Sequence, residues 1–278
     1  MCENVVTGKR RGYNRFDVEA AIGTALAPVL GAEFLQRTAA GLTGGEPDLT
    51  VRAFVRGDRV ILAVRLGPRP LHRRAYKQDT GPGTLHPPVA AALAAIAAPQ
   101  AGTLLDPFCG DGTIAIEAAL ARPALHVFAG DLDPQRVQNT RRNARRAAVS
   151  IDVSCRDAGA LRAPPGGIDA VVTNPPWSLA VDWAGQLTAS RRRFWDELPA
   201  LLGPAGLLCS LTDAGLGVPD LLARSGWATG LCQQLRLAGR VVHLLLASPG
   251  TAAPRLPPAL DRWRQRAMAA GVVTETGF

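Results

Sequence analysis

The tetrapeptide Asn174-Pro175-Pro176-Trp177 combines groups that can hold a flat molecule bearing an amino group. It follows an apolar run at residues 168–172, so we expect it at the end of a buried strand. Because the two prolines restrict the backbone, the amide oxygen of Asn174 and the carbonyl oxygen of Pro175 become fixed acceptors for one exocyclic NH2 group. The indole of Trp177 offers a face on which a ring can stack. The alternative interpretation is a proline-rich turn beside a core tryptophan.

A glycine-rich turn within residues 104–117, LLDPFCGDGTIAIE, is a second candidate for ligand binding. A strand is expected to end at Asp106, and Gly110 and Gly112 permit a tight turn and a close approach of backbone to ligand. The turn lacks the Gly-Lys-Ser/Thr ending of phosphate-binding loops and the G-x-G-x-x-G spacing of dinucleotide-binding folds. It therefore indicates a different ligand, or a purely structural turn.

Further acids follow the next predicted strands. Asp131 comes after the run HVFAG, where a carboxylate can accept hydrogen bonds from both ribose hydroxyls of an adenosyl group. Asp133 precedes Pro134, so it is either a ligand contact or the N-cap of the next helix. Asp157 follows a third run and either accepts a hydrogen bond from an adenine amino group or belongs to a turn.

These motifs interrupt a repeated pattern of strand, loop and helix that begins near residue 102. Short apolar runs predict strands at residues 103–108, 126–133, 151–157, 168–177, 206–213 and 241–248. Helices are expected between most of them, including residues 133–148 and 191–202. The alternation predicts a three-layer α/β fold with a mainly parallel sheet, in which ligands bind at the carboxyl ends of the strands.

The region before residue 77 has a different pattern. A helix is expected at residues 17–30 with Asp17 as its N-cap, and the alternating runs of residues 49–66, joined by Arg-Gly-Asp, predict a β-hairpin. The basic connector PLHRRAYK precedes a helix expected at residues 89–97. The predicted organisation is a small α+β N-terminal extension, a larger α/β domain that carries the motifs and a C-terminal tail, at residues 1–76, 77–250 and 251–278.

The net charge of +8 and the isoelectric point near 10.0 favour a polyanionic partner, because arginine and lysine side chains neutralise phosphates. Arginine supplies almost all of the positive charge, so a compositional bias of the whole genome explains it equally well. The arginine clusters within residues 141–146 and 191–193 are candidates for phosphate contact or for solvated helix faces.

The 5 cysteines are widely spaced and contain no C-x-x-C pair, so we expect no metal or redox site, and a reducing compartment. The N-terminus lacks the apolar core of a signal peptide. The most apolar run, residues 87–99, is too short to span a bilayer. A cytoplasmic protein without membrane association is the expectation.

Together, these motifs resemble the class I S-adenosylmethionine-dependent methyltransferases that modify amino nitrogens through an Asn/Asp-Pro-Pro-aromatic motif, over residues 84–248. DPFCGDGTIAIEAA, GDLD and NPPW are most similar to the THUMP-associated guanine-N2 methyltransferases of tRNA and ribosomal RNA. LHRRAYK…GTLHPPVAAAL is similar to the segment that joins their RNA-binding THUMP module to the catalytic domain. The resemblance implies a Rossmann-like domain with a seven-stranded, mainly parallel sheet and helices on both faces.

The resemblance also implies S-adenosylmethionine as the cofactor. Its expected contacts run from the methionine end through the ribose to the adenine: Asp106, Gly110 and Gly112, then Asp131, then Asp157. The other expected contacts either flank these residues, close over the cofactor or come from the proline motif: Thr84, Leu85, Pro107, Cys109, Thr113, Leu132, Ala158 and Asn174.

In such an enzyme Asn174, Pro175 and Trp177 would be catalytic, and the substrate would be the exocyclic amino group of an RNA base, foremost guanine N2 of tRNA or rRNA. The amine attacks the sulfonium methyl directly, so neither a metal nor a strong base is required. Residues 1–76 are shorter than a full THUMP module, so we expect a partial one, its C-terminal half around the hairpin of residues 49–66. A protein partner that supplies RNA affinity is the alternative. Trp177 stands where Tyr or Phe is usual. The sequence leaves the oligomeric state open.

Three other activities stay open at this point. DNA adenine-N6 methylation uses the same motif, but no stretch is long enough for an obvious target-recognition domain. Glutamine-N5 methylation of a protein also needs two acceptors, although the DPFCGDGT turn and the connector fit it poorly. A noncatalytic RNA-binding protein with a retained cofactor fold is disfavoured by the intact Asn174 and Trp177.

Overall fold

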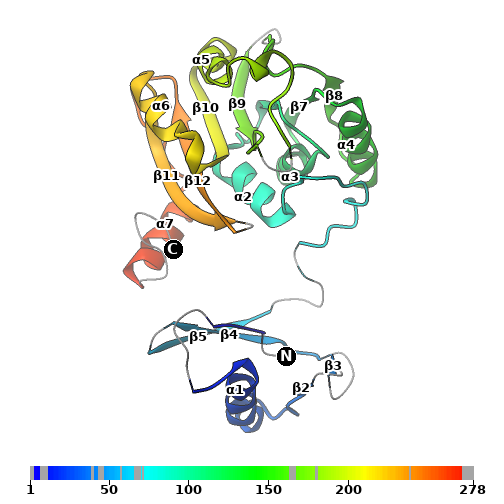
Figure 1. The fold of residues 1–278 in the computed structure, drawn as a ribbon, viewed down its shortest axis with the longest axis vertical. Helices are drawn as coiled ribbons and strands as arrows, with labels where there is room; N and C mark the ends of the chain where they lie inside the picture. Colours follow the sequence, from blue (N-terminus) through cyan, green and yellow to red (C-terminus); the bar gives the residue numbers. More distant parts are fainter. Residues whose placement is uncertain are drawn as a thin grey trace. The chain divides into compact units, whose positions relative to one another are not determined.

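The computed structural model describes residues 3–6, 12–38, 41–42, 47–56, 58–65, 70, 72–162, 167–178, 181–237 and 239–270. The chain divides into two compact units, Met1–Pro70 and Leu71–Phe278 (Figure 1). The basic connector predicted between the two domains therefore begins at the boundary between the units and continues into the second. From here on, the word connector denotes the whole segment of residues 70–86, which leads to the first helix of the second unit.

The first unit is a small α+β structure, as the sequence predicts. Strands β1 (Glu3–Val6), β4 (Val51–Arg56) and β5 (Arg59–Val64) form a sheet in the order β1-β4-β5. β1 runs parallel to β4, and β4 pairs antiparallel with β5 from Val51↔Val64 to Arg56↔Arg59. The predicted hairpin is thereby confirmed. A second, shorter hairpin joins β2 (Arg37–Thr38) to β3 (Gly41–Leu42).

Helix α1 (Arg15–Leu30) begins earlier than the sequence prediction. Its N-cap is Asn14, whose side chain accepts hydrogen bonds from the backbone N–H groups of Phe16 and Asp17. The Asp17 carboxylate in turn accepts from the Asn14 N–H at 2.7 Å, which completes a capping box. The prediction of Asp17 as the N-cap is therefore wrong: the acid occupies the third helical position and returns a bond to the cap.

The second unit contains, within the described residues, a seven-stranded sheet in the order β11-β12-β10-β9-β6-β7-β8. Its strands are β6 (Gly102–Asp106), β7 (Leu125–Asp131), β8 (Asp152–Cys155), β9 (Ile168–Thr173), β10 (Leu202–Asp213), β11 (Ala228–Leu237) and β12 (Arg240–Ser248). All neighbouring pairs from β10 to β8 are parallel, and β12 is antiparallel to both of its neighbours. The predicted Rossmann-like, mainly parallel fold is confirmed.

Helices cover both faces of this sheet (Figure 1). The helices of this unit are α2 (Pro87–Ala97), α3 (Thr113–Ala121), α4 (Pro134–Arg146), α5 (Arg192–Leu201), α6 (Val218–Arg224) and α7 (Pro258–Ala269), with 3-10 turns η1 (Gly185–Thr188) and η2 (Ala214–Leu216). No residue of α7 is buried, so this helix does not belong to the layers on the sheet. Residues of α2, α3 and α4 share one core cluster, and residues of η1, α5 and α6 share the other. The sheet lies between these two clusters, which gives the three layers that the sequence predicts.

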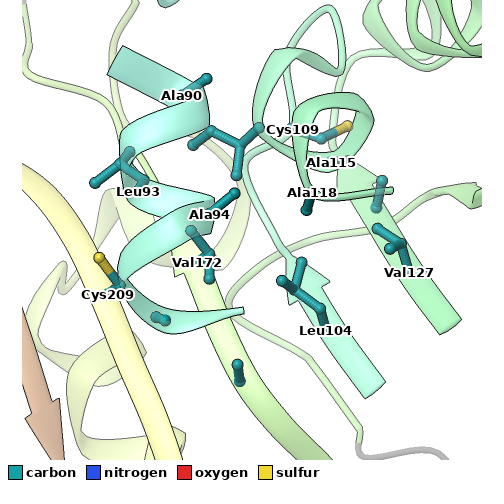
Figure 2. Packing of buried hydrophobic residues seen from close by; sticks show 14 of the residues in the cluster. Ala90, Leu93, Ala94, Leu104, Cys109, Ala115, Ala118, Val127, Val172 and Cys209 are labelled. Carbon is teal, nitrogen blue, oxygen red and sulfur yellow. The ribbon is translucent and has the colours of Figure 1, made fainter. Parts of the chain in front are cut away.

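Alanine-rich α2 packs closely on the sheet because its buried positions carry small side chains. Ala90 and Ala94 are fully buried, and they share a cluster with Leu104 of β6 and Val172 of β9 (Figure 2). Leu93, on the same helix, fills the space between the helix and the strands. This packing fixes α2 against α3, β9 and β10, and therefore fixes the end of the connector that leads into α2.

Within the described part of the chain, no helix is both long enough and apolar enough to cross a membrane. The same residues contain no group of three or more His, Cys, Asp or Glu side chains arranged to hold a metal ion.

Candidate functional site

The strand ends that carry the predicted motifs lie side by side. β9, β6, β7 and β8 are adjacent and parallel, so their carboxyl ends meet at one edge of the sheet. Asp106 and Asp131 are the last residues of β6 and β7, and Asn174 follows the last residue of β9. This edge is where open α/β sheets bind ligands.

The glycine-rich turn requires both of its glycines, for different reasons. Gly110 has φ +54 and Gly112 has φ +84, backbone conformations that glycine adopts at little cost. A Cβ atom on Gly112 would also lie 2.6 Å from Cγ2 of Thr140, whereas one on Gly110 would meet no atom within 4 Å. Space near Gly110 is therefore open. Gly112, the N-cap of α3, lies in close contact with Thr140 of α4.

The Asp106 carboxyl group is buried at the bottom of this turn, with 1% of the residue exposed. Its Oδ1 accepts hydrogen bonds from the Thr173 hydroxyl at 3.1 Å and from the Phe108 N–H at 3.4 Å, while Oδ2 has no partner within the described part of the chain. Burial raises the pKa of Asp106 to about 7. A half-satisfied buried carboxyl group is a site that a ligand cation can complete.

Asp131 has both oxygens engaged by the backbone. Oδ2 accepts from the Gly110 N–H and Oδ1 accepts from the Asp133 N–H, each at 2.9 Å. Burial raises the pKa of the Asp131 carboxyl group. Asp133 is the N-cap of α4, since its side chain accepts from the Gln135 N–H at 2.8 Å. The helix-capping interpretation of Asp133 is therefore confirmed. Leu132, between the two acids, is 42% exposed.

Asp157 lies beyond β8 in a turn that it stabilises itself. Its carboxylate accepts from the Gly159 N–H at 2.8 Å and from the Gln186 N–H at 2.9 Å. A Cβ atom on Gly185 would lie 2.3 Å from Asp157 Oδ2, so this close approach needs glycine. Ala158 is buried beside it. The structure thus gives Asp157 a turn role, and a contact with adenine stays a prediction.

The proline motif holds Asn174 and Trp177 in distinct surroundings. Asn174 is half-buried, and its Oδ1 atom is buried without a hydrogen-bond partner among the residues that the structure describes. Pro175 is buried. Trp177 is half-buried against the α2 face of the sheet, where its Nε1 donates to the Leu211 carbonyl at 3.4 Å. One edge of the indole is thereby anchored to β10.

Three further residues predicted to contact the cofactor lie in the glycine-rich turn and the connector. Cys109 directs its thiol toward the Thr140 hydroxyl, at 3.7 Å, within the core cluster. Its backbone N–H donates to the Gly130 carbonyl at 2.9 Å and its carbonyl accepts from the Gly112 N–H at 2.8 Å, so Cys109 holds the turn in shape and a ligand contact stays a prediction. Pro107 is buried next to it. Leu85 packs against the same core cluster at the end of the connector.

The sequence pattern of the RMKL-like methyltransferase domain family, UPF0020, matches residues 74–241. The chain belongs to this family. The matched region includes every strand whose carboxyl end carries one of the predicted motifs, so the site described above lies within the methyltransferase domain.

Named relatives cover most of the chain. A tRNA (guanine(6)-N2)-methyltransferase of Thermus thermophilus is 36% identical over 217 residues, which are 74% of this chain and 61% of the relative. A tRNA (guanine(10)-N2)-dimethyltransferase of Methanothermobacter thermautotrophicus is 30% identical over 209 residues, which are 71% and 60% of the two chains. The chain therefore spans about three fifths of the length of these relatives.

Solved structures agree with the fold. TrmN from Thermus thermophilus superimposes with a TM-score of 0.62 at 28% identity, over 89% of this chain and 70% of TrmN. The methyltransferase subunit of a type I restriction-modification system from Streptococcus thermophilus shares the fold, with a TM-score of 0.50 at 14% identity, over 70% and 55% of the chains. A class I methyltransferase fold implies S-adenosylmethionine as the cofactor.

The residues of this methyltransferase fit that cofactor. Among the described residues, the buried polar atoms without a partner include Asp106 Oδ2, Thr84 Oγ1 and Thr113 Oγ1. The amino acid end of S-adenosylmethionine carries an ammonium group, which needs an acceptor, and a carboxylate, which needs donors. A lone carboxylate oxygen and two hydroxyl groups supply both kinds of partner.

Sequence reasoning missed one member of the turn, Asp111, which is 2% exposed and hydrogen-bonded to α4. Its partner Asn139 and the nearby Asn143 are buried polar residues four positions apart on α4. Two asparagines four positions apart, among the charged residues of one helix, are the sequence signal that could have indicated this buried contact. The sequence left phosphate contact and a solvated helix face as alternatives for the α4 arginines. Arg142 and Arg146 instead form ion pairs with Asp79 of the connector.

Proposed function

We propose that this methyltransferase transfers a methyl group from S-adenosylmethionine to the exocyclic N2 of a guanine in tRNA or rRNA, with tRNA favoured. The observation that carries the proposal is the buried, unpartnered Oδ1 of Asn174, which follows β9 at the ligand-binding edge of the sheet. An acceptor so placed requires a donor, and a base amino group is one. The two named relatives, both tRNA guanine-N2 methyltransferases, support the choice of guanine and tRNA.

The cofactor contacts proposed here follow the order of the strands. Asp106 accepts from the ammonium group, and the hydroxyls of Thr84 and Thr113 donate to the carboxylate. Asp131 holds the ribose, and Asp157 lies at the adenine. Backbone groups and apolar side chains supply the other contacts, from Leu85, Pro107, Cys109, Gly110, Gly112, Leu132, Ala158 and Asn174. The bound cofactor supplies an electrophilic methyl group on a sulfonium.

The chain contributes orientation rather than acid–base chemistry. Asn174 Oδ1 and the Pro175 carbonyl accept the two N–H groups of the guanine amine, so its lone pair points at the methyl group. Trp177 stacks on the base and sets its plane. Proton loss follows transfer, because the amine becomes acidic only after it has gained the methyl group. The base must be unpaired or flipped out of its helix to enter.

We assign RNA binding to the first unit and to the arginine side chains that give the chain its positive charge. The α+β extension, within residues 1–76, is proposed to be a partial THUMP-like module that precedes a catalytic domain of residues 77–250 and a tail of residues 251–278. A protein partner that supplies further RNA affinity is the alternative. Binding to phosphates by arginine predicts an RNA affinity that falls steeply with salt.

The test is to incubate the protein with radiolabelled S-adenosylmethionine and separate pools of tRNA, rRNA, DNA and protein. N2-methylguanosine in a digest of the labelled RNA, identified by mass spectrometry, supports the proposal. Label in N6-methyladenine of DNA or in methylglutamine replaces it with the corresponding alternative. Asn174→Ala is the matched control, because it should lose the label while the protein still binds the cofactor.

A further inference from the structure

Asp111 is a buried carboxylate whose hydrogen-bonding capacity is used by the protein itself. Its Oδ1 accepts from Asn139 Nδ2 at 2.8 Å, and its Oδ2 accepts from the Gly81 N–H at 2.9 Å and from Arg136 Nη1 at 2.6 Å. The side chain of Asp111 has no exposed surface, and that of Arg136 is 13% exposed. Asp111 lies in the glycine-rich turn, yet its carboxylate is directed at α4 and at Gly81.

The donors to Asp111 come from two separate segments. Arg136 and Asn139 belong to α4, whereas Gly81 belongs to the connector before α2. A Cβ atom on Gly81 would lie 2.5 Å from Arg136 Nη1, so a larger residue here would displace the Arg136 guanidinium from its present position. Arg136 also donates to the Pro82 carbonyl. One carboxylate therefore joins the glycine-rich turn, α4 and the connector.

A second set of contacts holds the preceding part of the connector. Asp79 pairs with Arg142 at 3.0 Å and with Arg146. Asn143 donates to the Asp79 carbonyl at 2.8 Å and to the Asp111 carbonyl at 3.0 Å. The connector is thus fixed to α4 at Asp79 and Pro82, and to the glycine-rich turn at Gly81.

The two ends of this segment are also joined, since Lys77 Nζ donates to the Leu85 carbonyl. Residues 77–85 therefore form a closed strap across the turn. Thr84, near its end, has a buried hydroxyl group without a partner. The strap is the part of the protein that would carry Thr84 and Leu85 to the cofactor.

We propose that Asp111 is a positioning residue that holds this strap against the glycine-rich turn, so that Thr84 and Leu85 close over the methionine end of the cofactor. This inference rests on the proposed use of S-adenosylmethionine. Asp111 acts through Gly81 and Arg136 and does not touch the cofactor. Because a backbone N–H bond is directional, the carboxylate sets both the distance and the register of the strap.

Asp111→Asn in the full chain tests the proposal, since it keeps the shape of the side chain and removes the charge that pairs with Arg136. In the cofactor-free protein, hydrogen exchange of peptides covering residues 78–86 is expected to accelerate about tenfold or more. The dissociation constant for S-adenosylmethionine, measured by calorimetry, is expected to rise by a similar factor. The KM for RNA is expected to stay unchanged.

Asp213→Asn is the matched control. The Asp213 carboxylate is also buried, pairs with Arg240 and accepts a backbone bond from Gly215 at 2.9 Å, but it lies at the end of β10, away from the strap. Both variants are expected to lose comparable stability. Only Asp111→Asn should change the rate of hydrogen exchange in the strap and the affinity for the cofactor.

Equal exchange and equal cofactor affinity in the two variants would overturn the proposal and leave Asp111 with a structural role alone. If Asp111→Asn does not fold, Arg136→Met provides the test, because it retains the carboxylate and removes one link to the strap. A wild-type protein that binds S-adenosylmethionine but methylates no RNA would overturn the proposed function, while faster strap exchange and weaker cofactor binding in Asp111→Asn would still support the role of Asp111.

Discussion

The carboxylate of Asp131 accepts a hydrogen bond from the backbone N–H of Gly110 at 2.9 Å. The acid proposed to hold the ribose therefore also fixes the glycine-rich turn that precedes α3. A second bond, from the Asp133 N–H at 2.9 Å, orients the other carboxylate oxygen. Each oxygen has a further lone pair, so the carboxylate can accept from ribose hydroxyls while it keeps these two bonds.

Asp131→Ala is expected to raise the dissociation constant for S-adenosylmethionine by tenfold or more, because it removes a charged acceptor and loosens Gly110. Asp133→Ala is the matched control. It removes the N-cap of α4 and should cost about 1 kcal/mol of stability without a comparable change in cofactor affinity. Calorimetry and thermal unfolding of both variants separate the effects. Unchanged affinity in Asp131→Ala would contradict the ribose assignment.

Trp177→Ala is expected to raise the KM for RNA about 10- to 100-fold, because base–aromatic stacking contributes roughly 1–3 kcal/mol per base. Trp177→Phe should retain most of the stacking and lose the bond from Nε1 to the Leu211 carbonyl. If Trp177 serves only the core, both variants will lower the melting temperature and leave the KM for RNA unchanged. Steady-state kinetics with RNA as the varied substrate decides between the two roles.

Most strands could be predicted because their buried positions are apolar and a turn motif follows them. β9 is an example: Ile168 and residues 170–173 are buried, and Pro175 ends the run. β11 was not predicted, although its exposure alternates. Gln233 occupies a buried position of that strand, between Leu231 and Leu235, and so interrupts the apolar periodicity on which the prediction depends.

The site could be predicted as far as each residue acts through its local motif. Asp106 and Asn174 were found because strand, acid or amide, and turn are adjacent in the sequence. The strap could not be found in this way, since Asp111 binds Gly81, 30 positions away, and Arg136, 25 positions away. Such pairing depends on how α4 packs beside the turn, which no local pattern encodes.

Asn174→Ala is expected to lower kcat by two to three orders of magnitude, the usual cost of losing one oriented polar contact to the reacting group. Cofactor affinity should change by less than a factor of about three, because the amide faces the substrate in the proposed mechanism. Single-turnover assays with labelled cofactor, together with calorimetry, measure the two quantities. A loss of cofactor binding equal to the loss of kcat would assign Asn174 to the cofactor instead.

Cofactor affinity is expected to depend on pH through Asp106, whose pKa is raised to about 7 by burial. The ammonium group of the cofactor pairs with the carboxylate form, so affinity should fall about tenfold for each pH unit below about 7. Affinity should level off above about pH 7 and fall again from about pH 8, where an α-amino group loses its proton. Calorimetry between about pH 5.5 and 8 gives this slope. Asp106→Asn should bind weakly with no slope, whereas Asp213→Asn should retain the wild-type slope.

The stability of the cofactor-free protein should have the opposite dependence on pH. The folded-state pKa of Asp106 lies above its unfolded value of 3.8, so between these values the folded protein binds a proton that the unfolded chain does not. The stabilisation from this proton is fully present below about pH 4 and is lost as the pH rises through about 7. Acid denaturation from other carboxylates is superimposed on this effect, so the readout is the difference between wild type and Asp106→Asn in chemical unfolding. If the difference in unfolding stability between wild type and Asp106→Asn stays constant between about pH 5 and 8, Asp106 does not titrate in this range. It would then account for neither the pH dependence of cofactor affinity nor that of stability.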